Sequence, residues 1–94
     1  MRLSGIIWLE EVVEKLHRKH GVEPDEVEEI LEGRPRFRRI EAGRIEGEDL
    51  YAASGRTLAG RYLLVFFLYK TSREALIVSA RELSRKEKRR YAKK

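Results

Sequence analysis

The hydrophobic pattern of this chain changes its period at residues 33–35, and this change limits the fold more than any other feature. Before that point apolar residues recur at three- and four-residue spacing, which is typical of amphipathic helices. After it, short apolar stretches alternate with turn-forming segments, which is typical of strands. Helices followed by a run of strands predict an α+β protein.

The first part of the chain predicts a helical hairpin over residues 8–32. The apolar stripe of its first helix is formed by Trp8, Val12, Val13, Leu16 and His20. Gly21 supplies the left-handed residue that commonly ends a helix. Pro24 fits the first turn of the second helix, where a missing N–H costs no hydrogen bond. Val27, Ile30 and Leu31 form the buried stripe of that helix.

The second part predicts an antiparallel β-meander of three to four strands. Residues 50–56, 62–69 and 75–80 form three strands joined by short turns. Phe37 and Ile40 stand among arginines, which indicates an exposed or edge strand. Residues 3–7 are a candidate for a further short strand.

The chain closes with a predicted basic helix. Ser84 is followed three residues later by Glu87, the spacing of a capping box. The positive charge that follows lies at the negative end of the helix dipole. Only Leu83 and Tyr91 offer apolar anchors, so the helix should lie on the sheet edge or surface.

Length and composition exclude several classes of protein. With 94 residues the chain should form a single domain over residues 1–94, without room for a large cleft. It has no cysteine, which excludes disulfides and thiolate chemistry. No segment approaches the roughly 18 apolar residues of a membrane span, and residues 1–8 lack the apolar core of a signal peptide. We therefore expect a cytoplasmic protein that does not contact membranes.

The charge is distributed unequally along the chain. Residues 1–33 carry four Lys/Arg and nine Asp/Glu, or −5, whereas residues 34–94 carry seventeen and seven, or +10. A basic half of this size attracts nucleic-acid phosphates or an acidic protein. The alternative is ordinary solvated surface charge.

Several short motifs, in order over residues 6–92, resemble the BrnT family. They are Lys19-His20-Gly21-Val22, Asp25-Glu26-Val27, Gly55-Arg56-Thr57, Gly60-Arg61, Ile77-Val78-Ser79-Ala80-Arg81, and Glu87 with Tyr91, together with Trp8. The resemblance implies a RelE-like ribonuclease fold, RNA as substrate, and a toxin of a type II toxin–antitoxin pair held inactive by a BrnA-like antitoxin.

The first helix departs from the family pattern. Leu9 and Glu10 follow Trp8 where the family often has Asp-Pro, and Val12 and Leu16 stand where it often has Lys and Asn. This altered helix favours an alternative function, a catalytically silent module of the same fold that binds RNA or protein.

Arginines are the candidate phosphate ligands. Cleavage by internal attack of the 2′-hydroxyl needs a base, an acid and cations that stabilise the transition state, and the arginine fork binds phosphate through two hydrogen bonds. Arg56 and Arg81 end two strands of the meander, and Arg61 begins the strand between them. We expect Arg56 and Arg81 to be catalytic and Arg61 to bind RNA; salt bridges to the acidic helices are the alternative.

His20 is the candidate acid or base, because its ordinary pKa is near neutrality. Capping of backbone carbonyls is its alternative role. Lys19 could contact phosphate or simply favour the helix end. Glu26 could act as a base or orient an arginine, although its position early in the second helix favours capping.

The C-terminal helix supplies further candidates for RNA binding. These are Arg85, Arg89 and Tyr91, although Tyr91 could instead be a packing anchor. His17, His20 and Glu14 lack a further ligand with supporting groups, so we predict neither a metal nor another cofactor. The sequence also has no P-loop, dinucleotide-binding glycines or nucleophile elbow.

Three functions therefore compete: a metal-independent ribonuclease toxin, a silent binding module, and a protein-binding adaptor. In the last, Arg36, Arg38 and Arg39 would pair with an acidic segment of another chain. An exposed edge strand also makes a homo-oligomer an open alternative.

Overall fold

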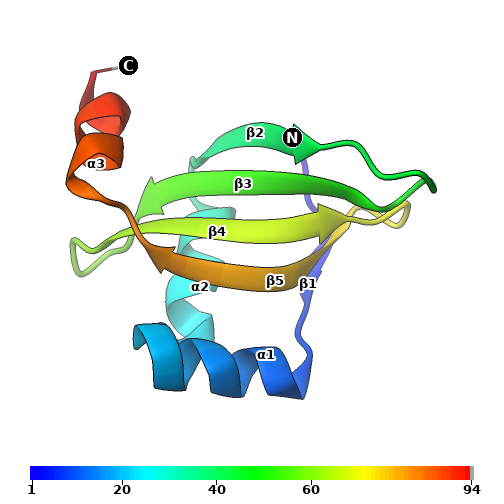
Figure 1. Cartoon of the computed structure of the whole chain (residues 1–94), viewed down its shortest axis with the longest axis horizontal. Coiled ribbons are helices and arrows are strands. Elements are labelled where there is room, and N and C mark those ends of the chain that lie inside the picture. Colours follow the sequence, from blue (N-terminus) through cyan, green and yellow to red (C-terminus); the bar gives the residue numbers. More distant parts are fainter. Residues whose placement is uncertain (94) are drawn as a thin grey trace.

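The computed structural model describes residues 1–93 and is an α+β protein, as predicted (Figure 1). The elements in chain order are β1 (Gly5–Ile7), α1 (Glu10–Lys15), the π-helix η1 (Leu16–His20), α2 (Pro24–Glu32), β2 (Arg36–Glu41), β3 (Asp49–Arg56), β4 (Tyr62–Tyr69), β5 (Glu74–Glu82) and α3 (Arg85–Ala92). No helix among these residues is long and apolar enough to cross a membrane.

The strands form one five-stranded mixed sheet in the order β1-β5-β4-β3-β2. Strands β3, β4 and β5 are the predicted antiparallel meander, and β2 is the predicted edge strand. The predicted count of three to four strands was too low, because the candidate strand at residues 3–7 is present as β1 and joins β5 in parallel, with Gly5 opposite Glu74. Its pairing with a segment so distant in sequence leaves little local signal.

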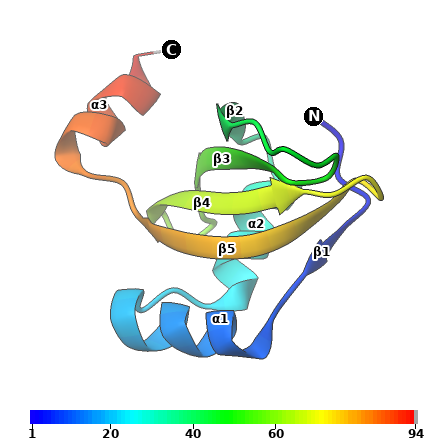
Figure 2. The same cartoon turned by 45° about the vertical axis from the view of Figure 1, so that its right-hand side comes forward.

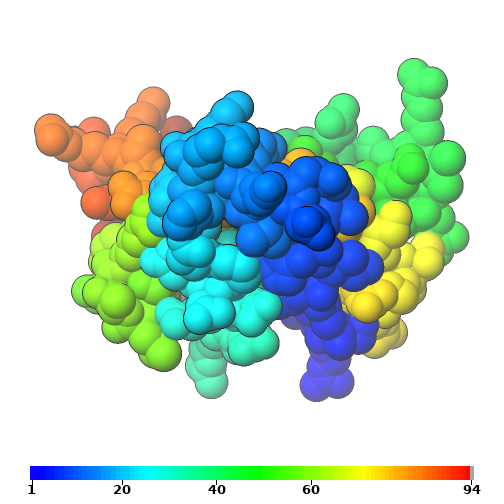
Figure 3. All heavy atoms as spheres, turned by 90° about the horizontal axis from the view of Figure 1, so that it is seen from below, coloured from blue at the N-terminus to red at the C-terminus, as the bar shows by residue number. Residues whose placement is uncertain are grey.

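The predicted helical hairpin is confirmed only as two consecutive helices. In Figures 1 and 2, α1 and α2 cross one another at a steep angle and do not lie antiparallel. Each helix buries its apolar side chains against the same face of the sheet, with Leu16 from η1 and Val27 and Ile30 from α2 in one core cluster. Figure 3 shows this face from outside, covered by α1, α2 and the N-terminal segment.

The end of the first helix differs from the predicted stripe. Leu16 is buried, but His20 is exposed, so His20 does not belong to the apolar face. The reason is that residues 16–20 form a π-helix, whose wider turn rotates later residues away from an α-helical stripe. Gly21 ends the helix as predicted, with a φ of 60°.

Alternation along β4 separates the two faces of the sheet. Leu63, Val65 and Phe67 are fully buried beneath the helices. Phe67 packs against Phe37 and Tyr51, with ring centroids 6.1 and 5.9 Å apart. Side chains at even positions of β4 point the opposite way, because successive residues of a strand alternate between faces.

We call this second surface the open face, because α1 and α2 do not cover it and only α3 stands over one end (Figure 2). Strand alternation and register assign to it Arg36 and Arg38 of β2, Leu50, Ala52, Ser54 and Arg56 of β3, Tyr62, Leu64, Phe66 and Leu68 of β4, and Leu76, Ser79 and Arg81 of β5. None of these residues belongs to the core cluster.

A candidate nucleic-acid interface

A groove of about 330 Å³ lies between α3 and the open face. Its walls combine apolar, hydroxyl and charged side chains. They are Arg36, Phe37, Arg38, Ala52, Ser54, Leu64, Leu83, Glu87, Arg90 and Tyr91. Three of these residues are arginines and one is a carboxylate, so the groove is electropositive.

Strand β5 holds α3 in place through an ion pair. Arg81 donates from Nη1 to Oε1 of Glu87 at 2.8 Å and from Nη2 to Oε2 at 3.0 Å. Glu87 also accepts from the backbone N–H of Ser84, which completes the predicted capping box. The bonds from Arg81 and then from Ser84 lower the pKa of Glu87 to about 2. Glu87 is therefore a carboxylate at any physiological pH.

Strand β2 makes a second attachment. The guanidinium of Arg36 donates to the carbonyls of Arg90 and Tyr91, at 3.5 Å in the case of Arg90. It also lies over the Tyr91 ring, with Cζ 4.7 Å from the centroid. The Tyr91 ring meets Tyr62 edge-on at 5.7 Å. Tyr91 is thus an anchor of α3, and its ring also lines the groove.

The structure divides the predicted site residues between two sides of the sheet. Arg56 and Arg81 lie on the open face, at the end of the sheet where α3 stands. Arg61 instead turns toward the helices: its Nη1 contacts Oε1 of Glu26 at 2.9 Å, and its Nε contacts Oε2 of Glu82 at 2.8 Å. The three arginines therefore do not form one patch.

The other candidates from the helices also lie on the covered side. Glu26 caps α2 by accepting from the backbone N–H of Glu23 at 3.0 Å, and it orients Arg61, so it fills two of its predicted roles. The carbonyl of His20 accepts from Nη2 of Arg61 at 3.1 Å. Lys19 and His20 are exposed at the end of η1, away from the groove.

Three predicted residues remain accessible near the groove. Arg56 is exposed, its Cζ lies 5.2 Å from the centroid of the Tyr62 ring, and no carboxylate pairs with it within residues 1–93. Arg85 and Arg89 are exposed on α3. Arg56 adds positive charge to the open face, and Arg85 and Arg89 add it to the exposed surface of α3.

Sequence reasoning did not name three arginines of the groove as candidates for RNA binding. Arg36 and Arg38 were considered only for a protein partner, and Arg90 only as helix charge. The alternation Arg36-Phe37-Arg38 was the available indication, because a partly buried Phe37 that packs on the core places both neighbouring arginines on the opposite face.

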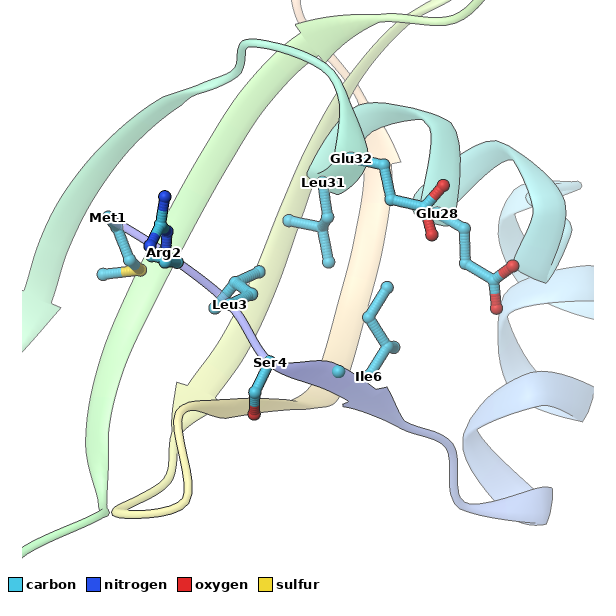
Figure 4. A pocket seen from close by; sticks show the side chains of 9 residues that line it. Met1, Arg2, Leu3, Ser4, Ile6, Glu28, Leu31 and Glu32 are labelled. Atoms are coloured by element: carbon cyan, nitrogen blue, oxygen red, sulfur yellow. The ribbon is translucent and has the colours of Figure 1, made fainter.

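A second cavity, of about 560 Å³, lies between the N-terminal segment and α2 (Figure 4). Leu3, Ile6 and Leu31 form its apolar part, and Glu28 and Glu32 stand along its rim. Its lining has two carboxylates and one arginine, Arg2, whereas the groove beside α3 has three arginines and one carboxylate, so that groove is the better candidate for RNA. No cluster of three or more metal-ligating His, Cys, Asp or Glu residues occurs in the described part of the chain.

Fold and site together define a class of protein: a small basic α+β domain with one covered sheet face and an arginine-lined groove on the other. Residues 8–87 match the family described as "Ribonuclease toxin, BrnT, of type II toxin-antitoxin system". The chain therefore belongs to the BrnT family, which confirms the resemblance found in its short motifs.

A solved structure agrees with this assignment at the level of the fold. The 1.1 Å crystal structure of the ribonuclease toxin BrnT from Brucella abortus is similar to this chain, with a TM-score of 0.67 and 23% sequence identity. The match covers 86% of this chain and 97% of the Brucella chain. No curated protein matches the sequence.

Proposed function

We propose that this protein is the ribonuclease toxin of a type II toxin–antitoxin pair and that it cleaves RNA in the groove beside α3. Membership of the BrnT family supports the reaction class. The proposed place of cleavage is supported by the groove itself, where Arg36, Arg38 and Arg90 converge beside Arg81. We expect it to act in the cytoplasm.

The proposed chemistry is metal-independent. The 2′-hydroxyl oxygen attacks phosphorus, the bond to the 5′-oxygen breaks, and a cyclic 2′,3′-phosphate remains. A base accepts the 2′-hydroxyl proton, and an acid returns a proton to the leaving 5′-oxygen. Arg56 and Arg81 stabilise the negative charge that develops on the phosphate oxygens.

The groove offers two groups for proton transfer. The phenol of Tyr91 can donate or accept a proton, and the Glu87 carboxylate can accept one, although its low pKa makes it a weak base. His20, Lys19, Glu26 and Arg61 were predicted to act in the site, but they lie on the covered side. For these residues to contact RNA bound in the groove, the RNA would have to pass around the ends of strands β4 and β5.

The partner of the proposed toxin is an antitoxin, for which we propose a BrnA-like protein with an acidic segment. The groove and the exposed arginines of α3 provide the complementary charge. Such a partner would inhibit the toxin by covering the arginines that hold RNA.

The test is incubation of the purified protein with labelled total RNA in the presence of a metal chelator. We expect the wild type to cleave RNA and an Arg56→Ala, Arg81→Ala double variant to leave it intact. Arg18→Ala is the matched control, because Arg18 is exposed on η1 and remote from the groove. Intact RNA with the wild type would contradict the proposal.

The silent binding module is the second candidate. It is favoured by the engaged state of Arg81, whose guanidinium already binds Glu87 through two hydrogen bonds. The altered first helix, with Leu9 and Glu10 after Trp8, also favours it. For such a module the same experiment would show RNA bound but not cleaved.

A further inference from the structure

The aromatic side chains of this protein separate by face of the sheet. On the covered face Phe37, Tyr51, Phe67 and Tyr69 pack against one another. On the side of the open face, every aromatic ring in a cation–π pair belongs to β4 or α3. The pairs are Arg36 with Tyr91, Arg56 and Lys88 with Tyr62, and Arg81 with Phe66.

In each pair the cation lies over the face of the ring, so the outer surface of the pair includes the cation. The cation-to-centroid distances are 4.7 Å for Arg36, 5.2 Å for Arg56, 5.6 Å for Lys88 and 5.9 Å for Arg81. Nucleobases stack on guanidinium planes as well as on aromatic rings. The covered face has no such surface, because its rings are buried or packed against other rings.

We infer that the open face binds unpaired RNA, with bases stacked on the Arg81–Phe66 and Arg56–Tyr62 pairs and phosphates held by the surrounding arginines. This inference rests on the proposed function, because it takes RNA as the ligand. Interleaved aromatic and cationic side chains are the usual means of holding single strands without strong sequence preference.

The spacing of the rings selects an unpaired strand over a duplex. Tyr62 and Phe66 lie four residues apart on β4, which is about 13 Å at ~3.3 Å per residue. Neighbouring bases of a duplex are fixed about 3.4 Å apart and expose no flat surface to a protein sheet. Only a strand whose bases are unstacked can place one base on each ring.

The arginines on the open face are placed to follow the backbone of such a strand. Arg38 lies beside Ala52, which pairs with Phe66, and Arg36 lies beside Ser54, which pairs with Leu64. Each arginine is thus two strands away from the central apolar row of β4. A base over β4 therefore leaves its phosphate near β2.

The test measures binding separately from cleavage. The probe is a fluorescent 2′-O-methyl oligouridine of about 8 nucleotides, within the range that one small domain covers. It has no free 2′-hydroxyl and cannot be cleaved by internal attack. Fluorescence anisotropy should show tighter binding of this probe than of an RNA duplex with the same number of phosphates.

Two variants should change binding in different ways. Phe66→Leu keeps an apolar side chain but removes the ring, and it should weaken binding about tenfold at every salt concentration. Arg38→Ala should reduce the slope of log K against log salt by about 0.7, the value for one phosphate contact on a single strand. Phe66→Trp should bind like the wild type, because it restores a stacking surface.

The outcomes separate this inference from the proposed function. Equal binding of duplex and oligouridine, or unchanged binding by Phe66→Leu, would overturn the inference even if total RNA is cleaved. Failure to bind any RNA would overturn it in favour of a protein occupant of the open face. Tight, Phe66-dependent binding without cleavage of total RNA would support the inference and contradict the nuclease.

Discussion

The guanidinium of Arg61 joins Glu26 of α2 to Glu82 of β5, at 2.9 and 2.8 Å. It also donates to the carbonyls of Gly21 at 2.7 Å and His20 at 3.1 Å, at the end of η1. One side chain thus ties both helical segments to the sheet. Arg61 thus makes the salt bridge to an acidic helix that was the alternative to its predicted RNA binding.

We expect Arg61→Ala to lower the free energy of unfolding by about 1–3 kcal/mol, because hydrogen bonds to charged groups and to helix-end carbonyls are lost together. Urea denaturation should show a lower midpoint with an unchanged slope. Arg18→Ala, which removes the same charge from an exposed position, is the control. Equal midpoints for the two variants would contradict this role.

The stability supplied by Glu87 should depend on pH. Its pKa is lowered from an ordinary 4.5 to about 2, chiefly by Arg81. Because the folded value lies below the unfolded one, the contribution is complete above pH 4.5 and is lost as the pH falls toward about 2. Thermal unfolding of the wild type and Glu87→Gln should therefore differ near neutrality and converge in that acidic range. A constant difference would show that the charge of Glu87 is not involved.

Gly55 allows α2 to approach β3 closely. A Cβ at this position would lie 3.1 Å from Cγ2 and 3.2 Å from Cδ1 of Ile30. We expect Gly55→Ala to destabilise the protein by about 1–3 kcal/mol through overpacking. Adding Ile30→Val, which removes the nearby Cδ1 methyl, should recover part of this loss. A double variant no more stable than Gly55→Ala would contradict the close contact.

Arg56 and Arg81 should behave differently when substituted singly. Arg56 is exposed and makes no ion pair within residues 1–93, so Arg56→Ala should change stability by less than about 0.5 kcal/mol. Arg81→Ala breaks the ion pair with Glu87 and should loosen α3. Hydrogen exchange of the α3 amides should therefore accelerate in Arg81→Ala but not in Arg56→Ala. Equal protection in both variants would show that other contacts hold α3.

Local patterns were sufficient to predict most elements of the fold. The existence of strand β4, the left-handed Gly21 and the Ser84–Glu87 cap each depend on neighbouring residues. The parallel pairing of β1 with β5 and the crossing of α1 and α2 depend on distant contacts. A single sequence carries little information about such contacts.

The candidate site was only partly predictable for a similar reason. Spacing identified Arg56 and Arg81, which lie at the same end of the open face. It could not show that Arg61 turns to the opposite side, because strand β4 begins only at the next residue, Tyr62. Because residues 16–20 form a π-helical turn, His20 does not lie on the apolar stripe of the first helix. No local pattern in the sequence predicted that turn.

The alternation of core and open-face residues along β4 determines which positions of the strand tolerate substitution. Leu63, Val65 and Phe67 hold the core, whereas Leu64 and Phe66 share a surface with the groove arginines. Substitutions at even positions can therefore vary what the surface recognises while the fold is maintained by the odd ones. One strand thus has a side kept constant by the need to fold and a side on which recognition can change.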